Sequence, residues 1–187
     1  MRYWYDTEFI EDGETIELIS IGIVAEDGRE CYAQSSEFYA PHANKWVKEN
    51  VLPHLLLCVS GGDQGTDENS NFHFGVGRCK SDSCPWRSYS QLRQDVLSFM
   101  APDIYGEPEL WGYYSAYDHV AFCHLFGTMM DLPKGYPMYT RDIKQWCDAL
   151  GNPRLPEQGK GEHNALADAR WNRVAWEFLA DKEKMRK

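Results

Sequence analysis

The stretch Tyr-Trp-Tyr-Asp-Thr-Glu-Phe, residues 3–9, determines both the start of the fold and the place of the chemistry. Its aromatic residues favour a β-strand. Asp6 and Glu8 interrupt the aromatic run and, two positions apart on a strand, project from the same face roughly 7 Å apart. A carboxylate that faces a core is costly unless it is paired, protonated or bound to a cation. The pair therefore suggests a metal site, although an isolated Asp-x-Glu is more often the polar face of an edge strand.

An antiparallel meander is expected to continue from this strand. A second strand is predicted over 15–25, with Ile19, Ile21 and Ile23 on one face, and a short turn leads into a third strand over about 30–38. Helix and strand patterns then alternate, which implies an α/β chain with a mixed β-sheet flanked by helices. The helices are expected over about 41–52, 92–100, 117–126, 142–150 and 164–182, and two more strands over 109–114 and 137–140.

Residues 58–86 break this alternation, because Gly, Asp, Asn and Ser dominate there without periodicity. We interpret them as a flexible surface insertion in a single domain that spans 1–187. The segment offers possible ligands for a structural zinc ion, but their irregular spacing favours incidental cysteines. These residues are Cys58, His73, Cys79 and Cys84.

Composition limits the possible functions. The 187 residues carry a formal net charge of −10, which argues against broad affinity for duplex DNA. A nucleic-acid enzyme is still compatible with this charge, because Mg²⁺ held by carboxylates can bind a phosphate group and the bases of a single strand can stack on aromatic rings. The chain shows no leader and no apolar run long enough to cross a membrane, so we expect a cytoplasmic protein with no membrane partner.

Acidic residues also stand at two expected helix starts. Asp118 follows an apolar strand, and taken alone it would be explained by the free backbone N–H groups and the dipole of its helix. Asp142 has the same explanation, and we interpret it, with Thr140, as a capping residue.

The final helix brings together a carboxylate and a histidine. Asp168 is expected on the apolar face of this helix, whereas the good N-cap Asn164 leaves His163 outside it, on the preceding loop. A fixed carboxylate beside a movable histidine suggests a metal ligand and a proton acceptor. A loop histidine alone is more often exposed and inert.

The chain contains three motifs in a fixed order: Asp-x-Glu on a strand, Tyr-Asp at a helix start, and His-x₄-Asp at the last helix. In this order of motifs it resembles the DEDDh 3′→5′ exonucleases, which have a ribonuclease-H-like fold. Two segments are similar to the polyadenylate-specific 3′-exoribonuclease AS family: Tyr-Asp-Thr-Glu-Phe-Ile-Glu-Asp-Gly at 5–13 and Ala-Tyr-Asp-His-Val-Ala at 116–121. The resemblance covers most of the chain except about 58–86. Ser115 and Ala116 depart from the wider superfamily, which often has asparagine just ahead of the second-motif aspartate.

The resemblance implies a two-metal site in which His163 is the general base. The implied ligands of two Mg²⁺ ions, which Mn²⁺ can replace, are Asp6, Glu8, Asp118 and Asp168. It also implies a homodimer that trims single-stranded RNA from the 3′ end, prefers adenylates and releases nucleoside 5′-monophosphates.

Residues around the first motif are expected to bind substrate. Thr7, Phe9 and Glu11 would border the pocket for the terminal nucleotide. Two other functions stay open: a catalytically idle, exonuclease-like RNA-binding module and a metal-dependent phosphohydrolase of free nucleotides. The first usually lacks a metal ligand, whereas all five motif positions are filled here. Basic residues that could contact phosphates, but more often have a solvated surface role, are Arg141, Lys144, Arg170 and Arg173.

Overall fold

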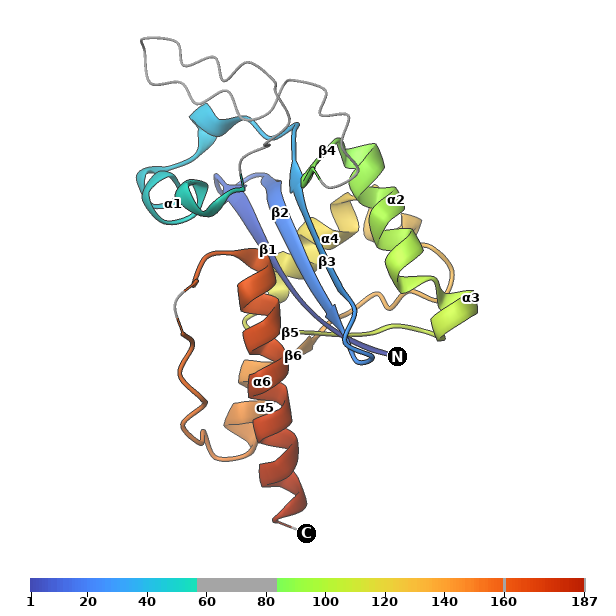
Figure 1. Cartoon of the computed structure of the whole chain (residues 1–187), viewed down its shortest axis with the longest axis vertical. Helices are drawn as coiled ribbons and strands as arrows, with labels where there is room; N and C mark the ends of the chain where they lie inside the picture. Colours follow the sequence, from blue (N-terminus) through green and yellow to red (C-terminus); the bar gives the residue numbers. More distant parts are fainter. Residues whose placement is uncertain (57–83, 160, 187) are drawn as a thin grey trace.

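One six-stranded mixed sheet organises the chain, in the order β4-β3-β2-β1-β5-β6 (Figure 1). The computed structural model describes residues 1–56, 84–159 and 161–186. Strands β1, β2 and β3 form the expected antiparallel meander, whereas β5 and β6 run parallel to β1 and β4 runs parallel to β3. The strands are Arg2–Glu11 (β1), Ile16–Ala25 (β2), Glu30–Ser35 (β3), Trp86–Arg87 (β4), Glu109–Gly112 (β5) and Arg141–Asp142 (β6). This is the α/β class predicted, and it is compatible with a ribonuclease-H-like fold.

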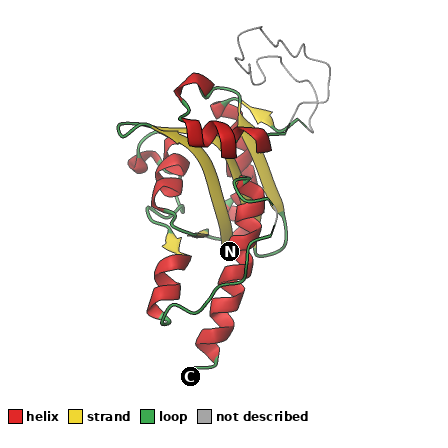
Figure 2. Cartoon of the chain, turned by 90° about the vertical axis from the view of Figure 1, so that its left-hand side faces the viewer, coloured by secondary structure: helices red, strands yellow, loops and turns green. Residues whose placement is uncertain are grey.

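Helices cover both faces of this sheet (Figures 1 and 2). On one face, side chains of α2 and α4 pack with Tyr3, Tyr5 and Ile21. On the other face, α5 and α6 pack with Trp4 and Val24. The helices are Lys45–Asn50 (α1), Tyr89–Met100 (α2), Pro102–Tyr105 (α3), Ala116–His124 (α4), Ile143–Ala149 (α5) and Ala165–Lys184 (α6), with short 3₁₀ turns at Ala40–His42, Leu52–His54 and Met129–Asp131.

The second strand differs from the prediction that three isoleucines share a face. The β1–β2 register passes from Glu8↔Ser20 to Phe9↔Leu18, so Ile19 is left without a partner. Such a bulge interrupts the alternation of side chains along a strand. Ile21 and Ile23 therefore pack towards α2 and α4, whereas Ile19 joins a separate cluster beneath α1.

Several expected boundaries were wrong. The third strand ends at Ser35, the expected helix over 41–52 is divided around α1, and 137–140 form a loop that precedes the short β6. Asp142 caps α5 as predicted, accepting from Gln145 N at 2.9 Å, but Thr140 lies outside that helix. None of the helices within the described ranges is long and apolar enough to cross a membrane.

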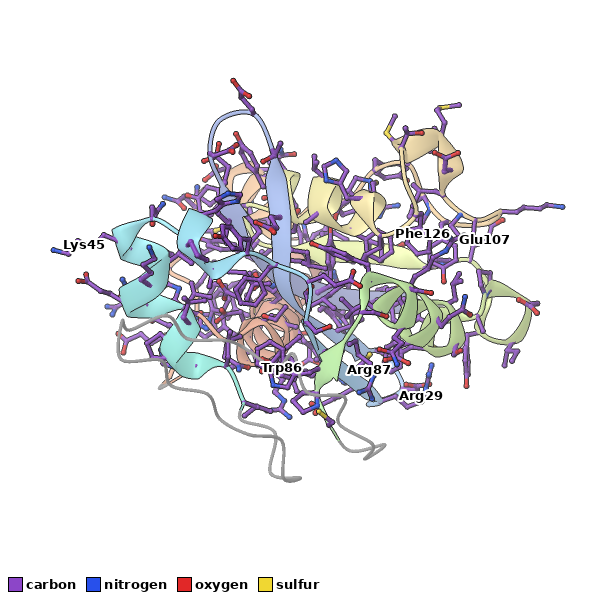
Figure 3. The ribbon with its side chains drawn as sticks, turned by 90° about the horizontal axis from the view of Figure 1, so that it is seen from above. Arg29, Lys45, Trp86, Arg87, Glu107 and Phe126 are labelled. Carbon is purple, nitrogen blue, oxygen red and sulfur yellow. The ribbon has the colours of Figure 1, made fainter. Side chains whose placement is uncertain are left out.

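The end of the expected insertion belongs to the sheet. Trp86 forms β4, and its ring stacks on Phe38 with centroids 6.5 Å apart, so Trp86 was wrongly assigned to a surface loop. Cys84 is buried in the same cluster. The other expected insertion residues up to position 83, including Cys58, His73 and Cys79, lie outside the described residues. Seen from above, Lys45 of α1 and Glu107, just before β5, lie on opposite sides of the molecule (Figure 3).

Candidate active site

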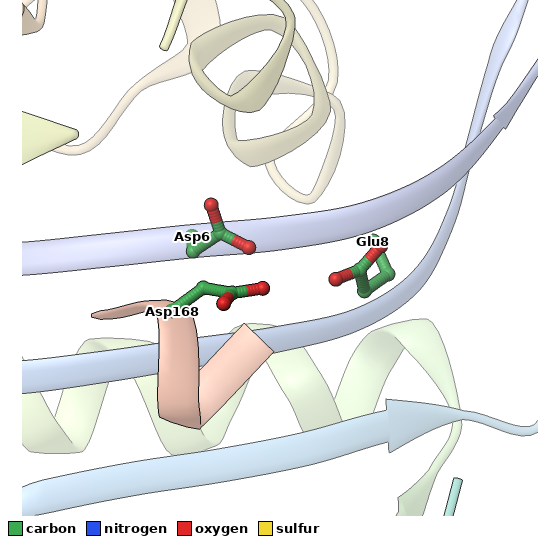
Figure 4. Close-up of side chains that lie close together, drawn as sticks. All are labelled: Asp6, Glu8 and Asp168. Carbon is green, nitrogen blue, oxygen red and sulfur yellow. The ribbon is translucent and has the colours of Figure 1, made fainter. Parts of the chain in front are cut away.

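Three of the four expected carboxylate ligands meet between β1 and the first turn of α6 (Figure 4). Asp6, Glu8 and Asp168 each offer an oxygen atom, and these atoms lie within 4.8 Å of one another. The period of two on β1 places Asp6 and Glu8 on the same face, as predicted, and it is the face that α6 covers. Residues from the two ends of the chain therefore form one acidic cluster.

The first turn of α6 is held close to the sheet and orients Asp168. Asn164 caps the helix as predicted, its side chain accepting from Ala167 N at 3.1 Å. The side-chain amide of Gln158 donates to Oδ1 of Asp168, and the backbone N–H of His163 donates to Oδ2 at 3.0 Å. Both oxygen atoms of Asp168 are thus bonded to the loop that precedes α6.

Asp118 lies in the first turn of α4, beside β1 and outside the group of three. Its Oδ1 accepts hydrogen bonds from the backbone N–H of Thr7 at 2.8 Å and from the Thr7 hydroxyl at 2.7 Å. Thr7 is buried and uses both donors on Asp118, so its side chain orients a carboxylate. Glu11, at the exposed end of β1, accepts from the N–H of Gly13 at 2.7 Å.

Burial raises the pKa of all four carboxylates, and repulsion within the group raises the pKa of Asp6 and Glu8 further. Burial, followed by repulsion from Asp168 and Asp118, raises the pKa of Glu8 to about 8. Burial and then repulsion from Asp118 raise the pKa of Asp6 well above its usual value. Burial raises the pKa of Asp118 to about 6, although the hydrogen bonds from Thr7 oppose this, and burial also raises the pKa of Asp168.

A divalent cation fits this donor set. Across the described ranges, the ion pairs of lysine and arginine involve other acidic residues and none of these four. Buried charges of one sign are costly without a counter-charge. Oxygen ligands from several carboxylates are those that Mg²⁺ binds in proteins. The residues therefore suit the predicted metal chemistry.

His163 stands just outside α6, where the N-cap argument predicted it. Its φ of 66° lies in the left-handed region, which is uncommon for a residue other than glycine and recurs at functional sites. Its half-buried ring meets the ring of Trp46 edge to face, with centroids 4.8 Å apart. The histidine is thus held beside the acidic cluster by its backbone and its ring.

Exposed aromatic rings stand near the cluster. Trp46 is 51% exposed, and Tyr117 is 52% exposed and stacks on Phe9 with centroids 6.0 Å apart. Trp46 was missed in the sequence, because its short helix shows no pattern that tells an exposed tryptophan from a core one. Phe9 follows Glu8 and its stacking partner Tyr117 precedes Asp118, so both rings are next in the chain to expected metal ligands. The role of Phe9 at the border of a nucleotide pocket stays a prediction.

The four basic residues considered for phosphate contacts are paired with acidic residues on the protein surface. Arg170 binds Glu30 through two hydrogen bonds, of 2.8 and 2.5 Å. The other pairs are Arg173 with Glu177, Arg141 with Glu109 and Lys144 with Asp148. Two surface hollows, of about 420 and 750 Å³, contain none of the four carboxylates.

Known proteins resemble most of the length of this chain. No family model matches it. Two curated proteins do: 3′-5′ exoribonuclease Rv2179c of Mycobacterium tuberculosis strain ATCC 25618 / H37Rv, and 3′-5′ exoribonuclease MT2234.1 of strain CDC 1551 / Oshkosh. Each is 45% identical over 170 residues, which cover 91% of this chain and 88% of the relative.

Proposed function

The chain belongs to the family of 3′-5′ exoribonucleases that these two mycobacterial proteins represent, and we propose that it trims single-stranded RNA from the 3′ end by metal-assisted hydrolysis. It is an enzyme, an exoribonuclease that acts in the 3′-5′ direction. The observation that carries the metal mechanism is the convergence of Asp6, Glu8 and Asp168, without a lysine or arginine partner among the described residues.

Asp6, Glu8, Asp118 and Asp168 would hold two Mg²⁺ ions, which Mn²⁺ can replace. Both bonds from Thr7 end on Oδ1 of Asp118, so Oδ2 is the atom that Asp118 offers. When bound, two such ions activate a water molecule and stabilise the departing 3′-oxygen. The protein's own contribution is to keep the carboxylates close, although burial and repulsion from the other carboxylates raise the pKa values of Asp6 and Glu8.

His163 would accept the proton of the attacking water. An imidazole nitrogen can take a proton and release it in each cycle, and histidine is the most common general base in enzymes. The hydrogen bond from its backbone to Asp168 ties the base to a metal ligand, which supports this role.

Exposed rings near the acidic cluster would hold the terminal nucleotides. Stacking on an aromatic ring contributes about 1–3 kcal/mol per base and does not require a basic surface. Such rings are Trp46 beside His163, and Tyr117 of α4, which stacks on Phe9 of β1. This accounts for RNA binding by a chain with a formal net charge of −10.

The adenylate preference and the homodimer rest on the resemblance to the AS family. Comparison of oligoadenylate with oligouridylate tests the first, and light scattering on the full chain tests the second. Equal rates on the two homopolymers would contradict the preference without contradicting exonuclease action.

The central test uses single-stranded RNA labelled at its 5′ end. With Mg²⁺, the chain should produce a ladder that shortens from the 3′ end and release nucleoside 5′-monophosphates, and excess EDTA should stop it. Internal fragments in place of a ladder would contradict exo-action. The exposed-turn variant Glu14→Ala is the control for Asp6→Ala, because it removes one carboxylate outside the cluster.

The same reactions separate the two alternative functions. Binding of the RNA without any shortening would favour a catalytically idle module. Hydrolysis of nucleoside triphosphates while RNA stays intact would favour a nucleotide phosphohydrolase.

A further inference from the structure

Strand β1 has an open edge at the acidic cluster. Its pairing with β5 runs from Arg2↔Glu109 to Trp4↔Trp111, whereas β1 itself continues to Glu11. Backbone groups of alternate residues point to the same edge of a strand, so Tyr5 and Thr7 both face the edge that β5 leaves free. Buried backbone groups need partners, and here they have to come from side chains.

Two side chains replace the missing strand on either side of Asp6. The amide Nδ2 of Asn172 donates to the carbonyl oxygen of Tyr5 at 2.9 Å. Asp118 accepts from the N–H of Thr7. Asn172 is only 1% exposed, although it is a polar residue in the middle of α6 and belongs to none of the motifs.

The same helix is held to the sheet a second time, at Gly22. Gly22 is the register partner of Asp6 on β2, and a Cβ there would lie 2.3 Å from the backbone of Ala165. Asp168 lies between Ala165 and Asn172 along α6. Because Gly22 has no side chain, the backbone of α6 can approach the sheet closely, and this contact sets the distance between helix and sheet. Packing alone does not fix the position of the helix along or around its own axis. The hydrogen bond from Asn172 to Tyr5 supplies that restraint.

We propose that Asn172 is a positioning residue for the metal centre, and that it sets the place of Asp168 relative to Asp6. This rests on the proposed function, because it assumes that the two carboxylates bind a common metal centre. If Asn172 only satisfied a buried carbonyl group, its loss would lower stability alone. A positioning role requires a loss of metal affinity as well.

The test compares Asn172→Ala and Asn172→Ser with Tyr3→Phe in the full chain. Tyr3→Phe is the matched control, because the Tyr3 hydroxyl also makes a buried hydrogen bond to a backbone carbonyl, that of Met100 at 3.3 Å. It lies on the same strand but faces α2, away from the carboxylates. The measurements are Mg²⁺ binding by calorimetry, melting temperature in EDTA, and kcat and KM on single-stranded RNA.

We expect Asn172→Ala to weaken Mg²⁺ binding about 10-fold or more, as is typical when a group that orients metal ligands is lost. The value of kcat should fall with it, Asn172→Ser should be intermediate because it keeps a donor, and Tyr3→Phe should lower the melting temperature without weakening Mg²⁺ binding. Mg²⁺ binding by Asn172→Ala as tight as that of Tyr3→Phe would overturn the inference. If the alanine variant does not fold, the serine variant decides by the same comparison. Absence of Mg²⁺ binding by the wild type would instead overturn the proposed function, and the inference with it.

Discussion

Replacing Glu8 with glutamine should stabilise the protein at pH 8 in the absence of metal. Glu8 is 8% exposed, and burial with the repulsion of Asp168 and Asp118 raises its pKa to about 8. Because this pKa lies above the usual 4.5, protonated Glu8 contributes stability that is present in full below about pH 4.5. That contribution is lost as the pH rises through about 8.

The magnitude follows from the two pKa values. The interval from 4.5 to about 8 corresponds to roughly 5 kcal/mol at about 1.4 kcal/mol per pH unit, and roughly 4 kcal/mol of this is already lost at pH 8. Glutamine has nearly the same shape and cannot ionise. Glu8→Gln should therefore exceed the wild type in unfolding free energy by up to roughly 4 kcal/mol at pH 8, and by no more than about 1 kcal/mol at pH 5.

The assay is urea unfolding followed by tryptophan fluorescence, at pH 5 and pH 8, in EDTA and then with Mg²⁺. Mg²⁺ should stabilise the wild type at pH 8, because a ligand that binds only the folded state adds its binding free energy. It should stabilise Glu8→Gln less. Glu14→Gln, which removes a charge from the exposed β1–β2 turn, is the control. A Glu8→Gln protein that unfolds at the same or lower urea concentration than the wild type, at pH 8 in EDTA, would refute the reasoning.

Three further changes separate chemistry from structure. Asp6→Ala should abolish RNA degradation and Mg²⁺ binding, since no nearby residue replaces a ligand on β1; near-wild-type degradation of end-labelled RNA would contradict the metal mechanism. His163→Ala should lower kcat by roughly 10²–10⁴-fold with Mg²⁺ affinity retained; single-turnover kinetics and a metal titration check this, and a wild-type rate would exclude the base role. Gly22→Ala should cost about 2 kcal/mol or more of unfolding free energy, because its Cβ would overlap the backbone of Ala165. Gly159→Ala, with open space around it, is the control in the same urea series, and equal effects would show that α6 does not press on β2.

Much of the fold and the candidate site could be read from local patterns. The period of two places Asp6 and Glu8 on one face of β1, and an N-cap preference places Asn164 at the start of α6 with His163 outside it. These features depend on bonds within a few residues, so neighbouring residues are enough to specify them. The order of the motifs along the chain also indicated the exonuclease family, which the two relatives support.

Pairing between distant segments decided the rest. The bulge that turns Ile19 away from Ile21 depends on the register of β2 against β1, which no single strand encodes. Asn172 is of a residue type usually found at the surface, and it becomes a buried donor because the pairing of β1 with β5 ends at Trp4 and leaves the carbonyl group of Tyr5 to a side chain. Local sequence selects which elements form and which way their side chains point. The contacts that fix Asp168 against Asp6 join residues more than 140 positions apart and exist only once the sheet and α6 have packed.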